Sequence, residues 1–80
     1  MSDESLSSLA RAIREVVAEY SRLPDPILRV QCKGIGKEPD QIVAGDLPLL
    51  AERIGAAVGM FTNPEKGKIV RQRIAALVHR

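Results

Sequence analysis

Residues 47–61, LPLLAERIGAAVGMF, constrain the fold more than any other part of this sequence. At helical spacing, most of their apolar side chains share one face, and a second apolar stripe lies almost opposite. Only Glu52 and Arg53 carry charge. A helix that is apolar on nearly all sides is normally buried on nearly all sides. The first face holds Leu47, Leu50, Ala51, Ile54, Ala57, Val58 and Phe61, and the second holds Leu49, Ala56 and Met60.

The short chain limits how much of this apolar surface it can bury by itself. A domain of 80 residues buries only about 60–65% of the surface of its unfolded chain. Cys32 is the only cysteine and His79 the only histidine, so neither an intramolecular disulfide nor a Cys/His zinc site can support the fold. Association with a second copy or with another protein is the remaining way to support the fold. We therefore expect Leu49, Ala56 and Met60 to contact a second copy or another protein.

The helix that contains this segment is predicted over residues 46–61, with Asp46 as its cap. Ala51, Gly55 and Gly59 follow one another at four-residue spacing, which lets a neighbouring helix approach closely. Each glycine costs about 1 kcal/mol of helix propensity. The spacing therefore indicates either tight packing or a bend.

A first helix is predicted over residues 4–23, where apolar residues recur every three or four positions and Pro24 follows. This face packs on the domain's own core in the simplest interpretation. A seven-residue repeat also allows a coiled-coil seam with another helix.

A last helix is predicted over residues 63–79. Two starts are possible: Thr62 with Glu65 has the spacing of a capping box, while Asn63 with Pro64 gives a cap followed by proline at the first helical position.

The segment 26–33 fits two interpretations. Asp25 as cap, Pro26 at the first helical position and Gly34 just past the end describe a short helix. Strict alternation of apolar and polar residues from Leu28 to Lys33 is instead typical of a strand. No other run in the chain alternates in this way to supply a partner strand, so we favour the helix.

The stretch Gly34-Ile35-Gly36, followed by Lys37, resembles the turn of helix-hairpin-helix DNA-binding elements. That resemblance implies backbone N–H groups that hold a phosphate. Pro39 and Asp40 depart from the pattern, because they place a proline early in the second helix and an acid near the phosphate. We favour a helix C-cap followed by a second turn.

Positive charge gathers late in the chain. Residues 1–40 carry six basic and seven acidic side chains, whereas residues 41–80 carry six basic and three acidic ones. No acid follows Glu65. Such a face accepts nucleic acid, which makes a small DNA-binding regulator the alternative function. Its phosphate contacts would be Lys66, Lys68, Arg71 and Arg73.

Catalysis has little support, because one cysteine and one histidine near the terminus do not make a nucleophile, a base and an orienting group. We expect no enzyme, no cofactor and no metal. The N-terminus has no basic start or uninterrupted apolar run, and no window has the roughly 18 apolar residues of a membrane span, so we expect a cytoplasmic protein.

Together these patterns predict one all-α domain over residues 1–80, a small bundle of three main helices with a short fourth element near 26–33. The favoured function is a non-enzymatic protein–protein interaction module that acts as a homodimer or as a small regulatory adaptor.

Overall fold

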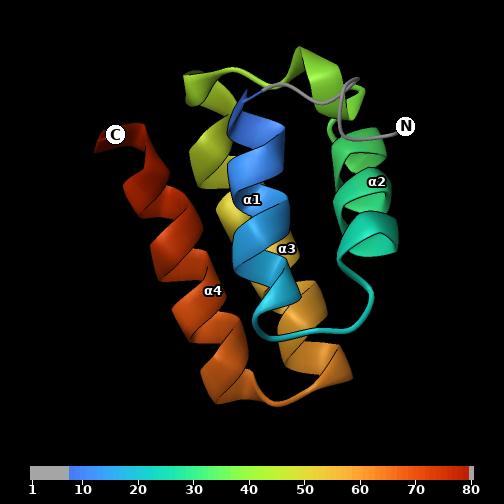
Figure 1. Ribbon diagram of the computed structural model, residues 1–80, viewed down its shortest axis with the longest axis vertical. Helices are drawn as coiled ribbons and strands as arrows, with labels where there is room; N and C mark the ends of the chain where they lie inside the picture. The colour runs from blue at the N-terminus through green and yellow to red at the C-terminus, as the bar shows by residue number, and fades with distance from the viewer. Residues whose placement is uncertain (1–7, 80) are drawn as a thin grey trace.

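The computed structural model describes residues 8–79, which form an all-α bundle of four helices without a strand in that range (Figure 1). In this view the helices run alternately down and up. Short 3₁₀ turns join α2 to α3 and follow α4. The helices are α1 (Ser8–Ala18), α2 (Pro24–Gly34), α3 (Leu47–Phe61) and α4 (Pro64–Ala76), and the 3₁₀ turns are η2 (Pro39–Gln41), η3 (Ala44–Asp46) and η4 (Leu77–His79).

Helix α1 ends at Ala18, five residues before the predicted end at residue 23, and its predicted start at residue 4 lies outside the described residues. Glu19 and Tyr20 continue as a turn and contact α4, where Arg73 binds both side chains. The face of α1 packs on the domain's own core, as the simplest interpretation predicted, through Ala10, Ile13, Val16 and Val17.

Helix α2 confirms the helical interpretation of segment 26–33, and the strand alternative is wrong. It is as long as α1, and it begins at Pro24 rather than after Asp25. Asp25 therefore lies inside the first turn, where it pairs with Arg14 of α1.

The chain leaves α2 through a Schellman motif, which confirms the C-cap interpretation of Gly34-Ile35-Gly36, but Gly34 is the last residue of the helix and not the one just past its end. Gly36 has a φ of 76°, and its N–H donates to the Lys33 carbonyl. The Lys37 and Ile35 N–H groups both donate to the Cys32 carbonyl. These donors are thus bonded within the helix end, as the motif requires.

The core lies where α1, α2 and α4 meet α3, which contributes the most buried residues. Every buried residue in the described range is apolar, so no buried charge needs a partner. The core comprises Ala10, Ile13, Val16, Val17, Ile27, Leu28, Cys32, Ile42, Leu47, Leu50, Ala51, Ile54, Ala57, Val58, Val70, Ile74 and Leu77.

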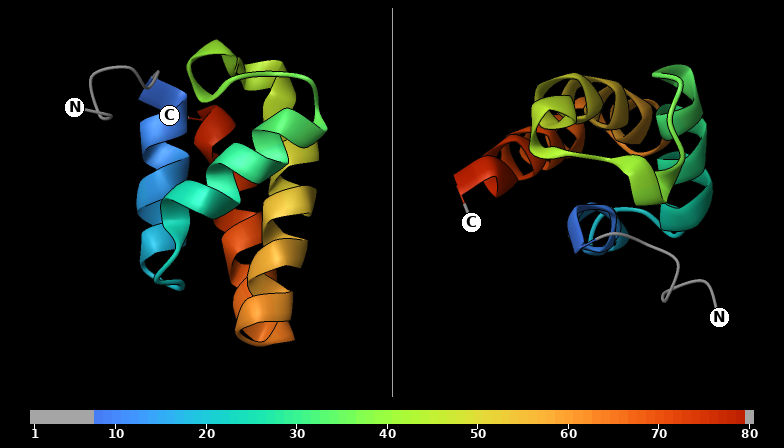
Figure 2. Two further views of the ribbon diagram at one scale, coloured as in Figure 1. Left: turned by 90° about the vertical axis from the view of Figure 1, so that its right-hand side faces the viewer. Right: turned by 90° about the horizontal axis from the view of Figure 1, so that it is seen from above.

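Helices α3 and α4 run side by side, whereas α2 crosses them obliquely (Figure 2). Three glycines make the α3–α4 approach possible. A Cβ on Gly67 would lie 2.5 Å from the Gly55 carbonyl oxygen and 2.9 Å from the Gly59 Cα. The glycine spacing in α3 therefore serves close packing, one of its two predicted uses.

Helix α4 begins with Asn63 as its cap, and the Asn63 side chain accepts a hydrogen bond from the Lys66 N–H at 2.9 Å. The other predicted start, the capping box of Thr62, is not used. Its hydroxyl instead donates to the Val58 carbonyl at 2.6 Å, which closes the end of α3.

Candidate functional site

The second apolar stripe of α3 lies on the surface of the bundle. Leu49 is 51% exposed, Met60 is 84% exposed, and Ala56 is exposed as well. Phe61, which the helical wheel assigned to the core face, is 68% exposed, so that assignment is wrong. The reason is position: α3 ends at Phe61, and the next residue already turns away toward α4.

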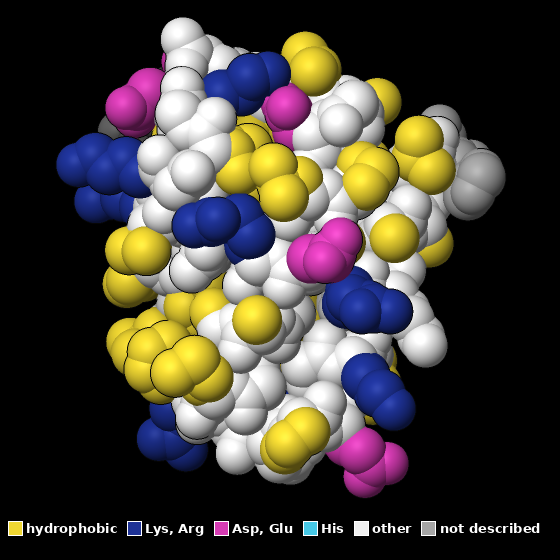
Figure 3. All heavy atoms as spheres, turned by 180° about the vertical axis from the view of Figure 1, so that it is seen from behind, with side chains coloured by type: hydrophobic (Ala, Val, Ile, Leu, Met, Phe, Trp, Pro, Cys, Tyr) yellow, Lys and Arg dark blue, Asp and Glu magenta, His cyan; other side chains and the backbone are white. Residues whose placement is uncertain are grey.

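An apolar groove of about 510 Å³ runs between α2 and α3. It exists because α2 crosses α3 obliquely, so the start of α2 lies farther from α3 than its end does (Figure 2). On the face seen in Figure 3, hydrophobic side chains gather at the lower left, on the side of the start of α2 and the end of α3. The lining residues are Leu23, Pro26, Ile27, Val30, Gln31, Arg53, Ala56, Ala57, Met60 and Phe61.

The narrow end of this groove is closed by a polar contact between its two walls. The Arg53 Nε donates to the Gln31 Oε1 at 3.2 Å. The same guanidinium lies over Gly34 at the end of α2, where a Cβ would be 2.1 Å from an Arg53 nitrogen. A cation at a helix C-terminus is favourable with respect to the helix dipole.

The three residues predicted at a partner contact do not share one site. Ala56 and Met60 line the α2–α3 groove, but Leu49, near the start of α3, does not. Ala56 and Met60 also form the ridge between this groove and a second one of about 520 Å³, which lies over the glycine contact of α3 and α4. Its other lining residues are Glu52, Gly55, Gly59, Pro64, Gly67, Lys68 and Arg71.

The groove residues that the sequence interpretation missed are mainly those of α2. Leu23 was assigned to the first helix, and Val30 to an undecided segment. Once 24–34 is read as a helix, Leu23, Pro26, Ile27 and Val30 follow the three-four spacing of one apolar face, which is a signal that could have found them.

The four basic residues of the alternative function fall into two groups. Lys66, Lys68 and Arg71 are exposed, and none is ion-paired within the described range. Arg73 instead binds Glu19 through two hydrogen bonds of 2.7 and 2.9 Å and lies 5.8 Å from the centre of the Tyr20 ring. The bond from Arg73 lowers the pKa of Glu19.

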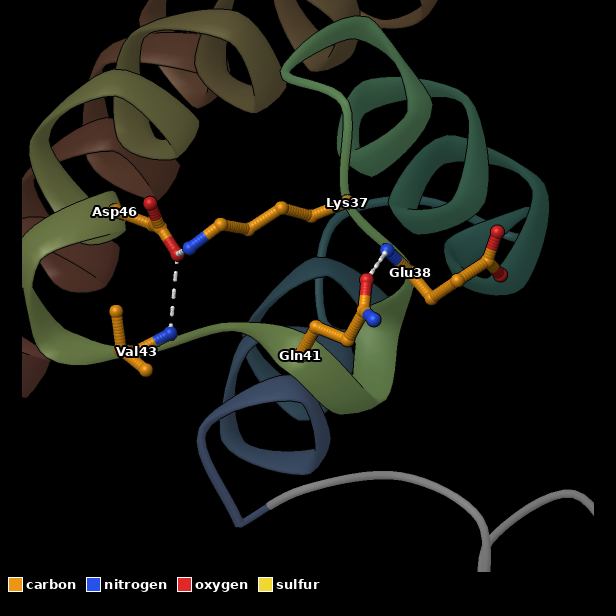
Figure 4. Close-up of polar contacts among 5 residues, drawn as sticks. All are labelled: Lys37, Glu38, Gln41, Val43 and Asp46. Atoms are coloured by element: carbon orange, nitrogen blue, oxygen red, sulfur yellow. Dashed lines mark hydrogen bonds and ion pairs between the residues drawn. The ribbon is translucent and has the colours of Figure 1, made fainter.

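The connection from α2 to α3 is held by side chains that bond to one another and to the backbone (Figure 4). Asp46 accepts from the Lys37 Nζ at 2.8 Å and from the Val43 N–H at 3.0 Å, and these bonds lower its pKa. Asp46 was predicted to cap α3, but its carboxylate makes no bond to that helix. The Gln41 side chain accepts from the Glu38 N–H at 2.9 Å.

The structure places Cys32 in the core, where burial raises the pKa of its thiol to about 11. The thiolate is therefore a negligible species near neutral pH. Among residues 8–79, no three His, Cys, Asp or Glu side chains gather in a way that could hold a metal ion. In the same range, no helix has both the length and the apolar content to cross a membrane.

Comparisons of the chain with protein-family models, with curated proteins and with solved structures find no match.

Proposed function

We propose that the protein is a non-enzymatic protein–protein interaction module and that its partner binds in the α2–α3 groove. The observation that carries the proposal is the exposure of four large apolar side chains around one depression. Leu23 is 55% exposed and Val30 61%, and both Met60 and Phe61 exceed these values. Single exposed apolar residues are normal on a protein surface, whereas a contiguous group of them marks a binding site.

Two kinds of partner are compatible with such a surface: a second copy, which makes a homodimer, or a different protein, which makes the chain a regulatory adaptor. In both cases the walls that form the groove come from rigid helices whose opposite faces are core. Such a site is formed before binding, so little ordering entropy opposes association.

Photo-crosslinking in cells tests the proposal. A benzoylphenylalanine in place of Met60 is expected to give a discrete covalent adduct with a defined protein, including a second copy of the chain. The matched control is the same substitution at Ala75, an exposed residue of α4 that does not line the groove. No adduct at residue 60, or the same adducts at both residues, would contradict the proposal.

The homodimer form has a simpler test by light scattering. If the chain forms this homodimer, Met60→Asp should dissociate it, because the carboxylate would be desolvated at the contact. Leu49→Asp is the control, since Leu49 is exposed on the same helix but lies outside the groove. A monomer at every concentration, unchanged by Met60→Asp, eliminates the homodimer and leaves only the adaptor.

The alternative function, a small DNA-binding regulator, is supported by the exposure of Lys66, Lys68 and Arg71 on α4. Arg73 would have to release Glu19 before it could bind a phosphate. Because phosphate contacts release counterions, affinity for duplex DNA would fall steeply with salt. A salt titration with the Lys68→Gln variant measures this directly, and no binding even at low salt eliminates the alternative.

A further inference from the structure

The walls of the α2–α3 groove restrict the conformation of whatever binds there. Both walls are helices, and within residues 8–79 there is no sheet edge to which an extended peptide could add a strand. Phe61 is the only aromatic residue in the lining, so the groove lacks the aromatic rows that hold proline-rich segments. An apolar trough between two helices is suited to a third helix.

The length of the groove also fits a helix. Its lining extends from Leu23, the residue before α2, to Gln31 on α2, and over residues 53–61 on α3. Nine helical residues rise by about 12 Å, which corresponds to two to three turns. A short amphipathic helix can therefore lie along the groove with its apolar face inward.

The apolar lining alone is too small to hold a partner firmly. Leu23, Val30, Met60 and Phe61 together expose an apolar area on the order of 500 Å². Stable interfaces bury about 800 Å² on each partner. An occupant must therefore also contact the residues along the edges of the groove.

Those edges are basic. On α2, Arg29 and Lys33 each stand three positions after a lining residue, Pro26 and Val30, and so lie next to them on the helix surface. Arg22 directly precedes the lining residue Leu23. All three cations are exposed, and none is ion-paired within the described residues.

On the α3 side of the groove, the nearby cations also outnumber the acids. Arg53 lines the groove itself, and Lys68 and Arg71 line the second groove across the Ala56–Met60 ridge. Glu52 is the one acid of α3, and Asp25, the one acid of α2, is held by Arg14 of α1. Figure 3 shows dark blue side chains above and below the hydrophobic group, with more toward the right.

We propose that the groove binds an amphipathic helix of another protein, whose apolar face lies between α2 and α3 and whose flanking residues are acidic. This inference rests on the proposed interaction function and names the chemistry of its partner. A second copy fits less well, because a two-fold contact through this face brings two basic edges together.

Selection from a random peptide library tests the inference without a known partner. The immobilised full chain is presented with displayed random peptides of about 16 residues, long enough for four helical turns. We expect enriched peptides to carry apolar residues at three-four spacing and acidic residues beside them. Fluorescence anisotropy of one enriched peptide then measures its affinity for variants of the chain.

Three variants locate the binding site and test its charge. Val30→Asp and Phe61→Ser each place a polar group in the groove and are expected to weaken binding at least tenfold, roughly the effect of losing an interface anchor. Arg29→Glu is expected to weaken binding about fivefold and to reduce its salt dependence. Lys66→Glu, the same change of charge on α4, is the control and is expected to leave the affinity unchanged. Circular dichroism confirms that each variant folds.

Each remaining outcome overturns a defined part of the account. If enriched peptides are neutral or basic and Arg29→Glu has no effect, the acidic helix is wrong while the groove remains a protein-binding site. If no enriched peptide is sensitive to Val30→Asp, both the inference and the proposed function fail. If phosphatidylserine vesicles or duplex DNA bind the chain and Val30→Asp abolishes that binding, the face belongs to a membrane or nucleic acid instead.

Discussion

Helix α3 is apolar on two sides, and the bundle uses these sides in opposite ways. Toward α4, Gly55 and Gly59 bring two backbones together, with Gly67 pressed against them. Toward α2, the helices diverge, and Met60 and Phe61 remain in solvent beside an apolar groove. The α3–α4 contact is therefore completed within the chain, whereas the α2–α3 contact leaves apolar side chains exposed to solvent.

The difference shows why the residue types on the two sides are unlike. A contact that the chain completes by itself can use glycine, because close packing of backbones replaces side-chain volume. An open surface needs large side chains that reach a partner, since a partner gains contact area from Met and Phe. The same helix thus carries glycines where it meets α4 and large exposed side chains beside the groove.

Gly67→Ala is expected to have the largest effect, because it adds a methyl group where the neighbours are backbone atoms of α3 that cannot rotate away. We expect a loss of about 3 kcal/mol of unfolding free energy, the upper end for overpacking. The gain of roughly 1 kcal/mol in helix propensity offsets only part of the clash. Urea denaturation measures the change.

Gly45→Ala is the control for this variant, because a Cβ at Gly45 would meet no atom within 4 Å. If Gly67→Ala unfolds at the same urea concentration as Gly45→Ala, the α3–α4 contact is looser than described.

Asn63→Ala is expected to cost about 1 kcal/mol, because it removes the side chain that caps α4 on the closed side of the bundle. On the open side, the residue before α2 is Leu23, whose side chain makes no capping bond. Leu23→Ala should therefore change stability by less than Asn63→Ala. Thermal unfolding of the two variants compares them, and an equal loss would mean that Leu23 packs within the fold.

Acid is expected to weaken two ion pairs near helix ends, Lys37–Asp46 and Arg73–Glu19. Bonds from Lys37 and Arg73 lower the pKa values of Asp46 and Glu19 in the folded state, so folding is favoured when both carboxylates are charged. This stabilisation is complete above about pH 5 and is lost as the pH falls through the lowered folded-state values. Unfolding temperature measured against pH is the readout.

The variant Asp46→Asn should flatten this pH dependence, whereas Asp40→Asn, at an exposed residue of η2, should leave it unchanged. Both ion pairs are partly or largely open to solvent, so added salt should reduce the effect. A slope that Asp46→Asn does not alter would contradict the role given to the Lys37–Asp46 pair.

Met60→Ser is expected to have the smallest effect on stability, within about 0.5 kcal/mol, because the side chain has few contacts to lose. Ile54→Val removes only one methyl group from the buried side of the same helix and should cost about 1 kcal/mol. Denaturation of the isolated monomer compares them. A larger loss for Met60→Ser than for Ile54→Val would show that the groove is closed.

The sequence predicted which segments form helices better than it predicted the residues at which the helices end. Periodicity at residues 47–61 and the glycine spacing were sufficient for α3 and its close neighbour, because both follow from side-chain size along one helix. The end of α1 at Ala18 was not predicted, because Pro24 marks only the farthest residue that a helix can reach.

Of the residues that line the groove, the sequence predicted some of those on α3 but none of those on α2. Met60 and Ala56 followed from the pattern of one predicted helix, whereas Leu23 and Val30 could be found only once residues 24–34 were read as a helix. Phe61 was misassigned because a helical wheel takes no account of where the helix ends. Asp46 stands at the predicted start of α3, but its side chain does not cap that helix because it bonds to Lys37 and the Val43 N–H instead.

The most direct test of the open side uses the methyl group of Met60. The chain has two methionines, so methyl-labelled methionine gives two signals in an NMR spectrum, and Met60→Leu assigns them. In the isolated monomer, a soluble gadolinium chelate should broaden the Met60 signal strongly, and a peptide bound in the groove should protect it. A Met60 signal already protected in the monomer, or one that a bound peptide leaves exposed, would contradict the account.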